Sequence, residues 1–144
     1  IVSIVEAVCS DMKLIRERGI TLEYETKTVM ISVNPELFSR LLVNLVSNAY
    51  RYGRENGHIR VRLWQEDSSL VLSVADDGIG IARNEQEKIF RRFYQADASR
   101  GGEGTGLGLA MVYEIARFYH GTVTVESVVD QGSTFVVRMP AGQS

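Results

Sequence analysis

The chain has 144 residues, the usual size of one domain with its own hydrophobic core, and two domains would each be small at this length. Its 44% hydrophobic and 24% charged residues are typical of a soluble globular protein, and a formal net charge of −2 excludes an overall electrostatic preference for nucleic acid or an anionic membrane. The single cysteine, Cys9, excludes an intrachain disulfide and a metal cluster built on cysteines.

The chain contains no apolar run of the roughly 18 residues that a membrane-spanning helix needs, and its N-terminus lacks the pattern of a signal peptide. We therefore expect one cytoplasmic domain over residues 1–144. Because the chain begins with Ile1 rather than Met, we also expect it to be a piece of a longer protein.

Hydrophobic periodicity predicts two helices near the N-terminus. Apolar residues at spacings of three and four predict a helix over residues 2–18, which Gly19 ends. Asn34 can cap a second, longer helix and Pro35 can occupy its first position, and this helix is expected to continue through about residue 52.

Alternating and β-rich runs predict a sheet, and two further helices are expected after its central hairpin. The predicted strands are residues 20–24, 29–33, 58–65, 70–75, 122–128 and 133–139. The later helices are expected at about 84–91 and 105–119. These elements predict an α+β fold, a two-layer sandwich in which about three helices cover one face of a mixed, mostly antiparallel sheet.

A glycine-rich run precedes the last predicted helix. Five of the 13 glycines lie within residues 101–108. Backbone without side chains can approach an anion closely, and the free N–H groups at a helix start favour phosphate. The run therefore indicates nucleotide binding, with an ordinary flexible loop as the alternative.

The predicted helix 35–52 carries a polar face beside its apolar one. At about 100° per residue, Asn44, Asn48 and Arg51 share that face, and Tyr52 lies at its border. Asparagine is unfavourable inside helices, but amide oxygens can ligate Mg²⁺ and amide N–H groups can contact phosphate. Arg51 would add a positive charge for the phosphates and Tyr52 could stack on a purine. The alternative is a solvated face that tolerates two asparagines.

A carboxylate follows the most apolar strand. Asp76 comes directly after residues 70–75, and Gly78 and Gly80 follow it. A carboxylate there can accept the exocyclic amine of adenine and reject guanine, whose carbonyl would face it, while the glycines let the base approach. The alternative is a turn stabilised by aspartate hydrogen bonds.

In this order, the segments resemble the ATP-binding catalytic domain of sensor histidine kinases, within the ATPase superfamily that also holds gyrase, a heat-shock chaperone and mismatch-repair proteins. The likeness covers nearly the whole chain. Matching segments are an asparagine box (44–53), a first glycine box (76–81), a phenylalanine box (88–94), a second glycine box (104–109) and a closing hairpin (132–140).

The resemblance implies ATP and Mg²⁺ as cofactors. It implies that Asn44, Asn48 and Arg51 are the catalytic residues at the phosphate end, with Asn48 also as the metal ligand. Asp76 would accept the adenine amine. Residues 94–104 would form a mobile ATP lid, anchored by Phe90 and Phe93. The other implied binding residues are Tyr52, Gly78, Gly80, Ile81, Gly104, Thr105, Gly106, Leu107, Gly108 and Thr134.

The sequence departs from the family pattern in two respects. Gln95 stands where many relatives carry a basic residue for the γ-phosphate, for which Arg91, Arg92 or Arg100 could substitute. Neither histidine of the chain, His58 or His120, has the setting of a phosphoacceptor.

The resemblance thus implies a kinase domain that donates the γ-phosphoryl to a histidine on a separate helical dimerisation domain, with a response regulator as a further partner. The chain itself is expected to be monomeric and to bind no nucleic acid, and the parent is expected to be a bacterial sensor, with an inner-membrane anchor as one option. Two alternatives remain: a gated ATPase of the same superfamily, and a nucleotide-gated interaction module without transfer.

Overall fold

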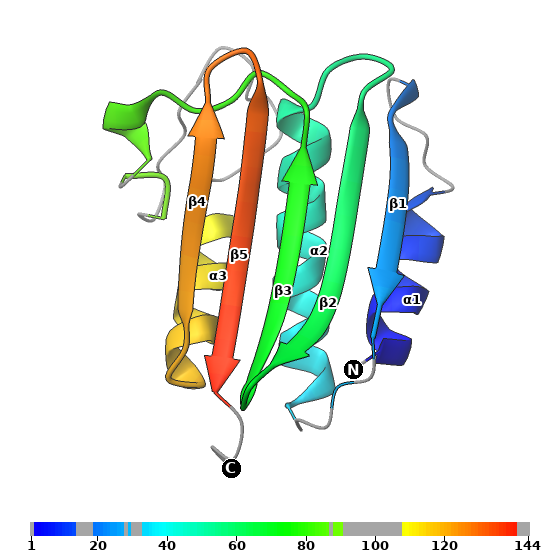
Figure 1. Ribbon diagram of the computed structural model, residues 1–144, viewed down its shortest axis with the longest axis vertical. Coiled ribbons are helices and arrows are strands. Elements are labelled where there is room, and N and C mark those ends of the chain that lie inside the picture. The colour runs from blue at the N-terminus through cyan, green and yellow to red at the C-terminus, as the bar shows by residue number, and fades with distance from the viewer. Residues whose placement is uncertain are drawn as a thin grey trace.

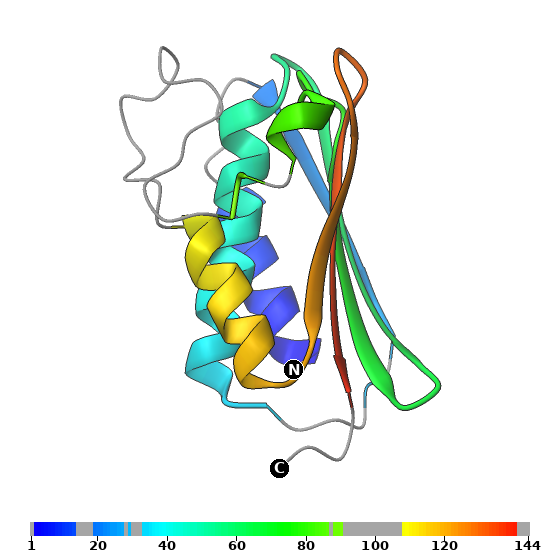
Figure 2. The ribbon, with the colours of Figure 1, turned by 90° about the vertical axis from the view of Figure 1, so that its left-hand side faces the viewer.

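A five-stranded sheet forms one layer of the molecule, and helices cover one of its faces (Figures 1 and 2). The computed structural model describes residues 2–13, 19–27, 29, 33–86, 88–90 and 108–140. Among the described helices, none is long and apolar enough to cross a membrane.

The strand order in the sheet is β1-β2-β3-β5-β4. β1 runs parallel to β2, and the other three neighbouring pairs are antiparallel, so the sheet is mixed. The strands are β1 (Thr21–Thr26), β2 (His58–Glu66), β3 (Ser69–Asp76), β4 (Thr122–Val128) and β5 (Gly132–Pro140).

Three α-helices lie on the same side of the sheet, as the edge-on view in Figure 2 shows. They are α1 (Val2–Lys13), α2 (Pro35–Tyr52) and α3 (Gly108–Phe118). The core lies between these helices and the sheet, because strand residues that alternate along β2 and β5 are buried on that face, such as Ile59, Val61, Phe135 and Val137.

Helix α2 begins where the sequence predicts it. The side-chain oxygen of Asn34 accepts hydrogen bonds from the backbone N–H groups of Glu36 (2.9 Å) and Leu37 (3.1 Å), which is the geometry of an N-cap. The Asn34 N–H donates to the hydroxyl of Tyr119 at 2.7 Å, so the start of α2 is joined to the segment that follows α3.

The α+β sandwich predicted from the sequence is confirmed, and some element boundaries differ. The short helix expected at 84–91 is a 3₁₀ helix, η2 (Arg83–Glu85), because the backbone bonds of Glu85, Gln86 and Lys88 reach back three residues instead of four. In the described part of the chain α3 begins at residue 108. Val29 and Val33 are not in a strand, and residues 30–32 between them lie outside the described residues.

Candidate functional site

The end of α2 and the loop after β3 meet at the end of the sheet where β3 finishes, at the top in Figure 1. The backbone N–H of Ile79 donates to the carbonyl oxygen of Tyr52, the last residue of α2, at 3.1 Å. A Cβ atom added to Gly78 would lie 2.1 Å from that same oxygen. The loop therefore lies directly on the last turn of α2, at a distance that only glycine allows.

Asp76 is the last residue of β3 and pairs with Ile59 on one side and Ser133 on the other. This register places its side chain on the helix-covered face, where it is half-buried and accepts a hydrogen bond from Gly78 N–H at 2.9 Å. Burial raises the pKa of Asp76 to about 6, and the nearby charge of Asp77 adds to this, against the lowering effect of the Gly78 and Ser133 backbone bonds. The result is an acceptor group between the sheet and α2.

Asp77, the next residue, is held by a different part of the chain. Its carboxylate accepts bonds from the backbone N–H of His58 at 2.8 Å and contacts the His58 ring nitrogen Nδ1 at 3.0 Å. Burial pushes its pKa up, but the bonds and charge of His58 outweigh burial and hold the pKa of Asp77 below its usual value. The two adjacent aspartates therefore differ: Asp76 lies toward the helices and Asp77 is bound to the start of β2.

The glycine loop also packs against the β4–β5 hairpin. Gly80 has a φ of +72°, and a Cβ atom there would lie 2.2 Å from the carbonyl oxygen of Val128. The Ile81 N–H donates to the hydroxyl of Ser127 at 2.6 Å, and the Gln86 side chain donates to the carbonyl oxygens of Ile81 and Ser127. Helix α2 and the hairpin therefore enclose the loop from two sides.

The polar face of α2 lies next to the start of α3. Asn44, Asn48 and Arg51 are all half-buried, whereas the apolar face of α2 is buried at Phe38, Leu41, Leu42, Leu45, Val46 and Ala49. A Cβ atom added to Gly108, the first residue of α3, would lie 3.4 Å from the side-chain oxygen of Asn44. The Arg51 guanidinium lies 5.6 Å from the centre of the Tyr52 ring. The asparagine box and the last glycine of the second glycine box are thus brought together.

Phe90 is partly buried and packs against the hydrophobic core. Its ring lies 6.1 Å from that of Phe135 and 6.2 Å from that of Tyr113, measured between ring centres. The phenylalanine box is therefore attached to the sheet and to α3 through this residue.

One predicted residue lies on the other side of the sheet. Thr134 pairs with Ala75, and alternation along β5 places its side chain on the face opposite to that of Asp76. Its neighbour Ser133, which the motif comparison missed, is buried on the helix-covered face opposite Asp76, with its hydroxyl 2.7 Å from that of Ser127. The apolar residues at 135, 137 and 139 could have indicated this, because they share their strand face with position 133.

Several predicted residues lie outside the described part of the chain. They are Gly104, Thr105, Gly106 and Leu107 of the second glycine box, the lid 94–104 with Gln95 and Arg100, and Arg91, Arg92 and Phe93.

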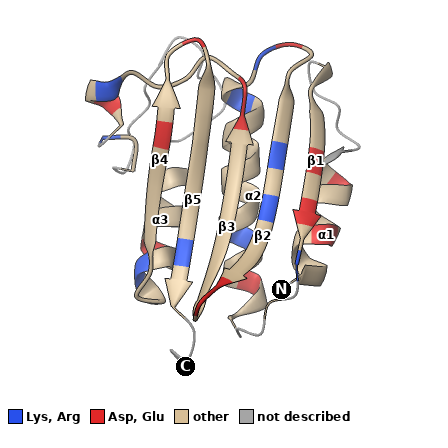
Figure 3. Cartoon of the chain, viewed as in Figure 1, with Lys and Arg blue, Asp and Glu red and all other residues tan. Residues whose placement is uncertain are grey.

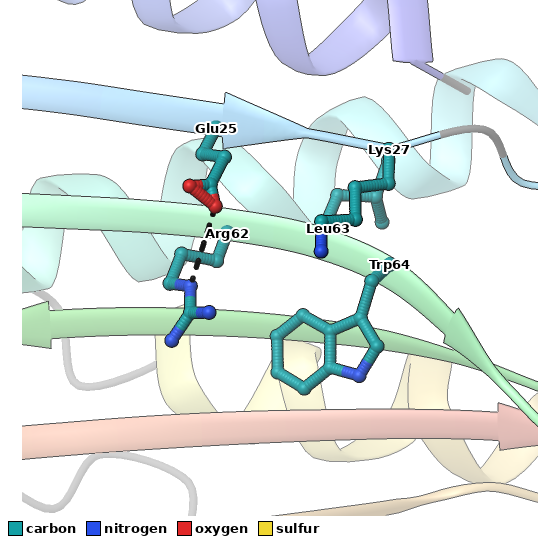
Figure 4. A pocket seen from close by; sticks show the side chains of 5 residues that line it. All are labelled: Glu25, Lys27, Arg62, Leu63 and Trp64. Carbon is teal, nitrogen blue, oxygen red and sulfur yellow. Dashed lines mark ion pairs between the residues drawn. The ribbon is translucent and has the colours of Figure 1, made fainter.

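The open face of the sheet carries a separate depression, shown in Figure 4, lined by Glu25, Lys27, Arg62, Leu63 and Trp64. Arg62 is 4.0 Å from Glu25 and lies over the Trp64 ring at 5.4 Å. Figure 3 shows the basic residues of β2 facing acidic residues of β1 on this surface. The depression contains no predicted site residue and lies across the sheet from the helices.

Residues 33–143 match the family described as histidine kinase-, DNA gyrase B-, and HSP90-like ATPase. The circadian input-output histidine kinase CikA of Synechococcus elongatus is 36% identical over 121 residues, which cover 83% of this chain and 16% of CikA. The sensor histidine kinase RppB of Synechocystis sp. is 40% identical over 109 residues, which cover 74% of this chain and 24% of RppB. The chain thus spans a minor part of the length of these relatives.

Two solved structures have the same fold. The mycobacterial sensor histidine kinase MprB has a TM-score of 0.86 at 23% identity, with 97% of this chain and 95% of that chain covered. Full-length ShkA, solved in complex with AMPPNP, has a TM-score of 0.85 at 27% identity, with 99% of this chain and 31% of that chain covered. Since the family match extends over most of the residues and includes both helix α2 and the loop after β3, the chain belongs to the family of histidine kinase-, DNA gyrase B-, and HSP90-like ATPases.

Proposed function

We propose that this chain binds Mg·ATP between α2 and the loop after β3, and that it donates the γ-phosphoryl group to a histidine on a separate helical dimerisation domain. One observation carries the proposal. The Ile79–Tyr52 backbone bond joins the loop that bears Asp76 to the helix that bears Asn44 and Asn48, so an acceptor for a base and amides for phosphates belong to one site.

The residues present fit the phosphate end of a nucleotide and its metal ion. Asn48 offers a neutral oxygen ligand to Mg²⁺, and Asn44 lies beside the start of α3, whose free N–H groups favour phosphate. Arg51 supplies a positive charge on the same face of α2. Bound Mg²⁺ would neutralise charge on the phosphates. The backbone of Gly104, Thr105, Gly106 and Leu107 is assigned to the same phosphates by the family pattern.

The opposite end of the site fits an adenine ring. The carboxylate of Asp76 is assigned as the acceptor for the exocyclic amine, and the missing side chain of Gly78 keeps that approach open. Gly80, Ile81 and Tyr52 would line the base. Ser133, rather than Thr134, shares the sheet face of Asp76, and we assign its hydroxyl to this end.

The protein's part in transfer is to position the nucleotide and to stabilise charge in the transition state. The acceptor histidine, and a response regulator that would receive the group afterwards, are proposed partners on other domains or chains. The named relatives are sensor kinases, which supports this assignment.

The test is to mix the 144-residue chain with its cognate helical domain, Mg²⁺ and ATP labelled on the γ-phosphate. Acid-labile label on a histidine of the helical domain is the expected result. Nucleotide binding without transfer would favour an interaction module gated by nucleotide, and release of labelled phosphate by the chain alone would favour a gated ATPase. Absence of ATP binding in calorimetry would overturn the whole proposal.

A further inference from the structure

Arg54 joins three segments of the chain at the edge of the site. It follows the end of α2 by two residues, and its side chain is exposed. Its Nε donates to the carbonyl oxygen of Asp77 at 2.7 Å, and its Nη2 donates to the carbonyl oxygen of Asp130. Asp77 belongs to the loop after β3 and Asp130 to the β4–β5 turn.

One of these carbonyl groups belongs to the glycine loop itself and the other to the β4–β5 turn that packs against the loop. The Asp130 N–H donates to the carbonyl oxygen of Ile79 at 2.8 Å, and the Ile79 N–H donates to Tyr52 on α2. The glycines at positions 78 and 80 have no side chains, so the loop is held through backbone bonds and close packing. Arg54 adds one charged donor to the glycine loop and one to the β4–β5 turn. Hydrogen bonds with a charged partner are stronger than those between neutral groups.

We infer that Arg54 is a positioning residue for the purine end of the nucleotide site, an inference that rests on the proposed ATP binding. It fixes the loop after β3 against the β4–β5 turn, and so sets where Asp76 and Gly78 stand relative to Tyr52. Asp76 directly precedes the residue whose carbonyl oxygen Arg54 binds, so a shift of that carbonyl moves the acceptor carboxylate.

The geometry requires an arginine. The guanidinium is a planar fork that presents Nε and Nη2 to two acceptors at once, whereas the ammonium of lysine is a single point charge on a flexible stem. Arg54→Lys keeps the charge and loses the fork. Arg54→Met keeps much of the length of the side chain and loses every donor.

The effect is confined to one end of the nucleotide. Arg54 contacts the loop and the turn. The phosphate-end amides Asn48 and Asn44 stand about one and about two turns before Tyr52, the last residue of α2. Loss of Arg54 therefore weakens recognition of the base and leaves recognition of the phosphates in place. A general loss of folding would weaken both.

The experiment is an NMR titration of the 144-residue chain with Mg·ATP and, separately, with magnesium and inorganic tripolyphosphate. We expect Arg54→Met to bind Mg·ATP about tenfold more weakly, as loss of a charge-assisted bond would cause, and to bind tripolyphosphate within about twofold of the wild-type value. Arg54→Lys is expected to fall between Arg54→Met and wild type for Mg·ATP. Backbone amide spectra report whether each variant is folded.

The matched control is Arg60→Met. Arg60 lies on the open face of the sheet, where it is 3.9 Å from Glu25, and its replacement is expected to change neither affinity. Wild-type affinity for Mg·ATP in the folded Arg54 variants would overturn the inference, and so would equal weakening toward both ligands. If Arg54→Met does not fold, the test uses Arg54→Lys alone, with its affinities for Mg·ATP and for tripolyphosphate each compared with those of the wild type. Failure of the wild-type chain to bind Mg·ATP would instead remove the proposed function on which the inference rests.

Discussion

The carboxylate of Asp76 is a strongly perturbed acid of the candidate site. It lies at the end of β3, half-buried on the helix-covered face, and burial raises its pKa to about 6. A perturbed titratable group among close-packed glycines is typical of a binding site, because a burial cost of this kind is offset when a ligand supplies a partner. Binding at Asp76 is therefore expected to depend on its carboxylate and on pH.

Asp76→Asn is expected to weaken ATP binding by roughly 10- to 100-fold, because the amide turns a donor toward the adenine amine or offers it an uncharged acceptor. Calorimetric titration with Mg·ATP measures this. Asp77→Asn is the comparison, since the Asp77 carboxylate is bound by His58, and its replacement is expected to cost less affinity. Unchanged ATP affinity in Asp76→Asn would remove Asp76 from the site.

The raised pKa of Asp76 predicts a pH dependence of base recognition. Above about pH 6 the free carboxylate is ionised and accepts the adenine amine, and below that value it is protonated and loses its charge. We expect the affinity for adenosine, which carries no phosphate that titrates in this range, to fall as the pH is lowered from 7 to 5. NMR titrations at several pH values check this. In Asp76→Asn the profile is expected to be flat, and a sloping profile there would assign the effect to another group.

At the scale of elements, the site depends on how closely α2, the loop after β3 and the β4–β5 hairpin approach. Backbone atoms of neighbouring segments lie close to Gly78 and Gly80. Gly132 has a φ of +128°, and a Cβ atom added to it would lie 2.1 Å from the carbonyl oxygen of Asp76. The backbone segments are therefore in contact, and the Ile79 N–H bond to Tyr52 is part of that contact. The close packing of α2, the loop after β3 and the β4–β5 hairpin therefore leaves no room for a side chain at these glycines.

Gly78→Ala tests this contact. A Cβ atom there would lie 2.1 Å from the Tyr52 oxygen, so the loop has to move away from α2, and we expect a loss of about 1–3 kcal/mol in the free energy of unfolding together with loss of ATP binding. Urea denaturation and calorimetry measure the two effects. Gly108→Ala is the stability control, since its nearest contact would be 3.4 Å. A Gly78→Ala variant as stable as Gly108→Ala would contradict the close approach.

Across the whole molecule, the helices lie on one side of the sheet and the other face of the sheet is open (Figure 2). Helix α2 carries one acidic residue, Glu36, which is exposed in its first turn and stands two turns before Asn44. The helix that bears the asparagines thus places no carboxylate beside them. The described helix therefore offers no carboxylate next to the asparagines that could act as a general base on water.

The chain alone is therefore expected to bind ATP and to hydrolyse it at a rate well below about 1 per second, the lower end of typical enzyme turnover. Phosphate release measured over hours, on protein shown by calorimetry to be saturated with Mg·ATP, checks this. Addition of the helical domain is expected to consume ATP by transfer. Rapid phosphate release without that domain would contradict the kinase assignment and favour the ATPase alternative.

Most helices and strands could be predicted from residues that are neighbours in the sequence. The cap at Asn34, the period of α2 and the alternation in β2 and β5 are read from neighbouring residues, and the structure confirms the elements that they predict. The short helix predicted after the loop is present as three residues of 3₁₀ helix, Arg83–Glu85, whose hydrogen bonds span three residues, a spacing that a hydrophobic pattern does not reveal.

The fold class, the amphipathic face of α2 and an aspartate at a strand end could be predicted from the sequence, since each depends on periodicity or on adjacent residues. The three-dimensional arrangement was needed to see that Ser133 and not Thr134 shares the sheet face of Asp76, and that Arg54 reaches two carbonyl groups in distant segments. The reason is physical: strand register and the docking of a loop on a helix arise from contacts between residues far apart in the chain, and those contacts set which side chains share a face.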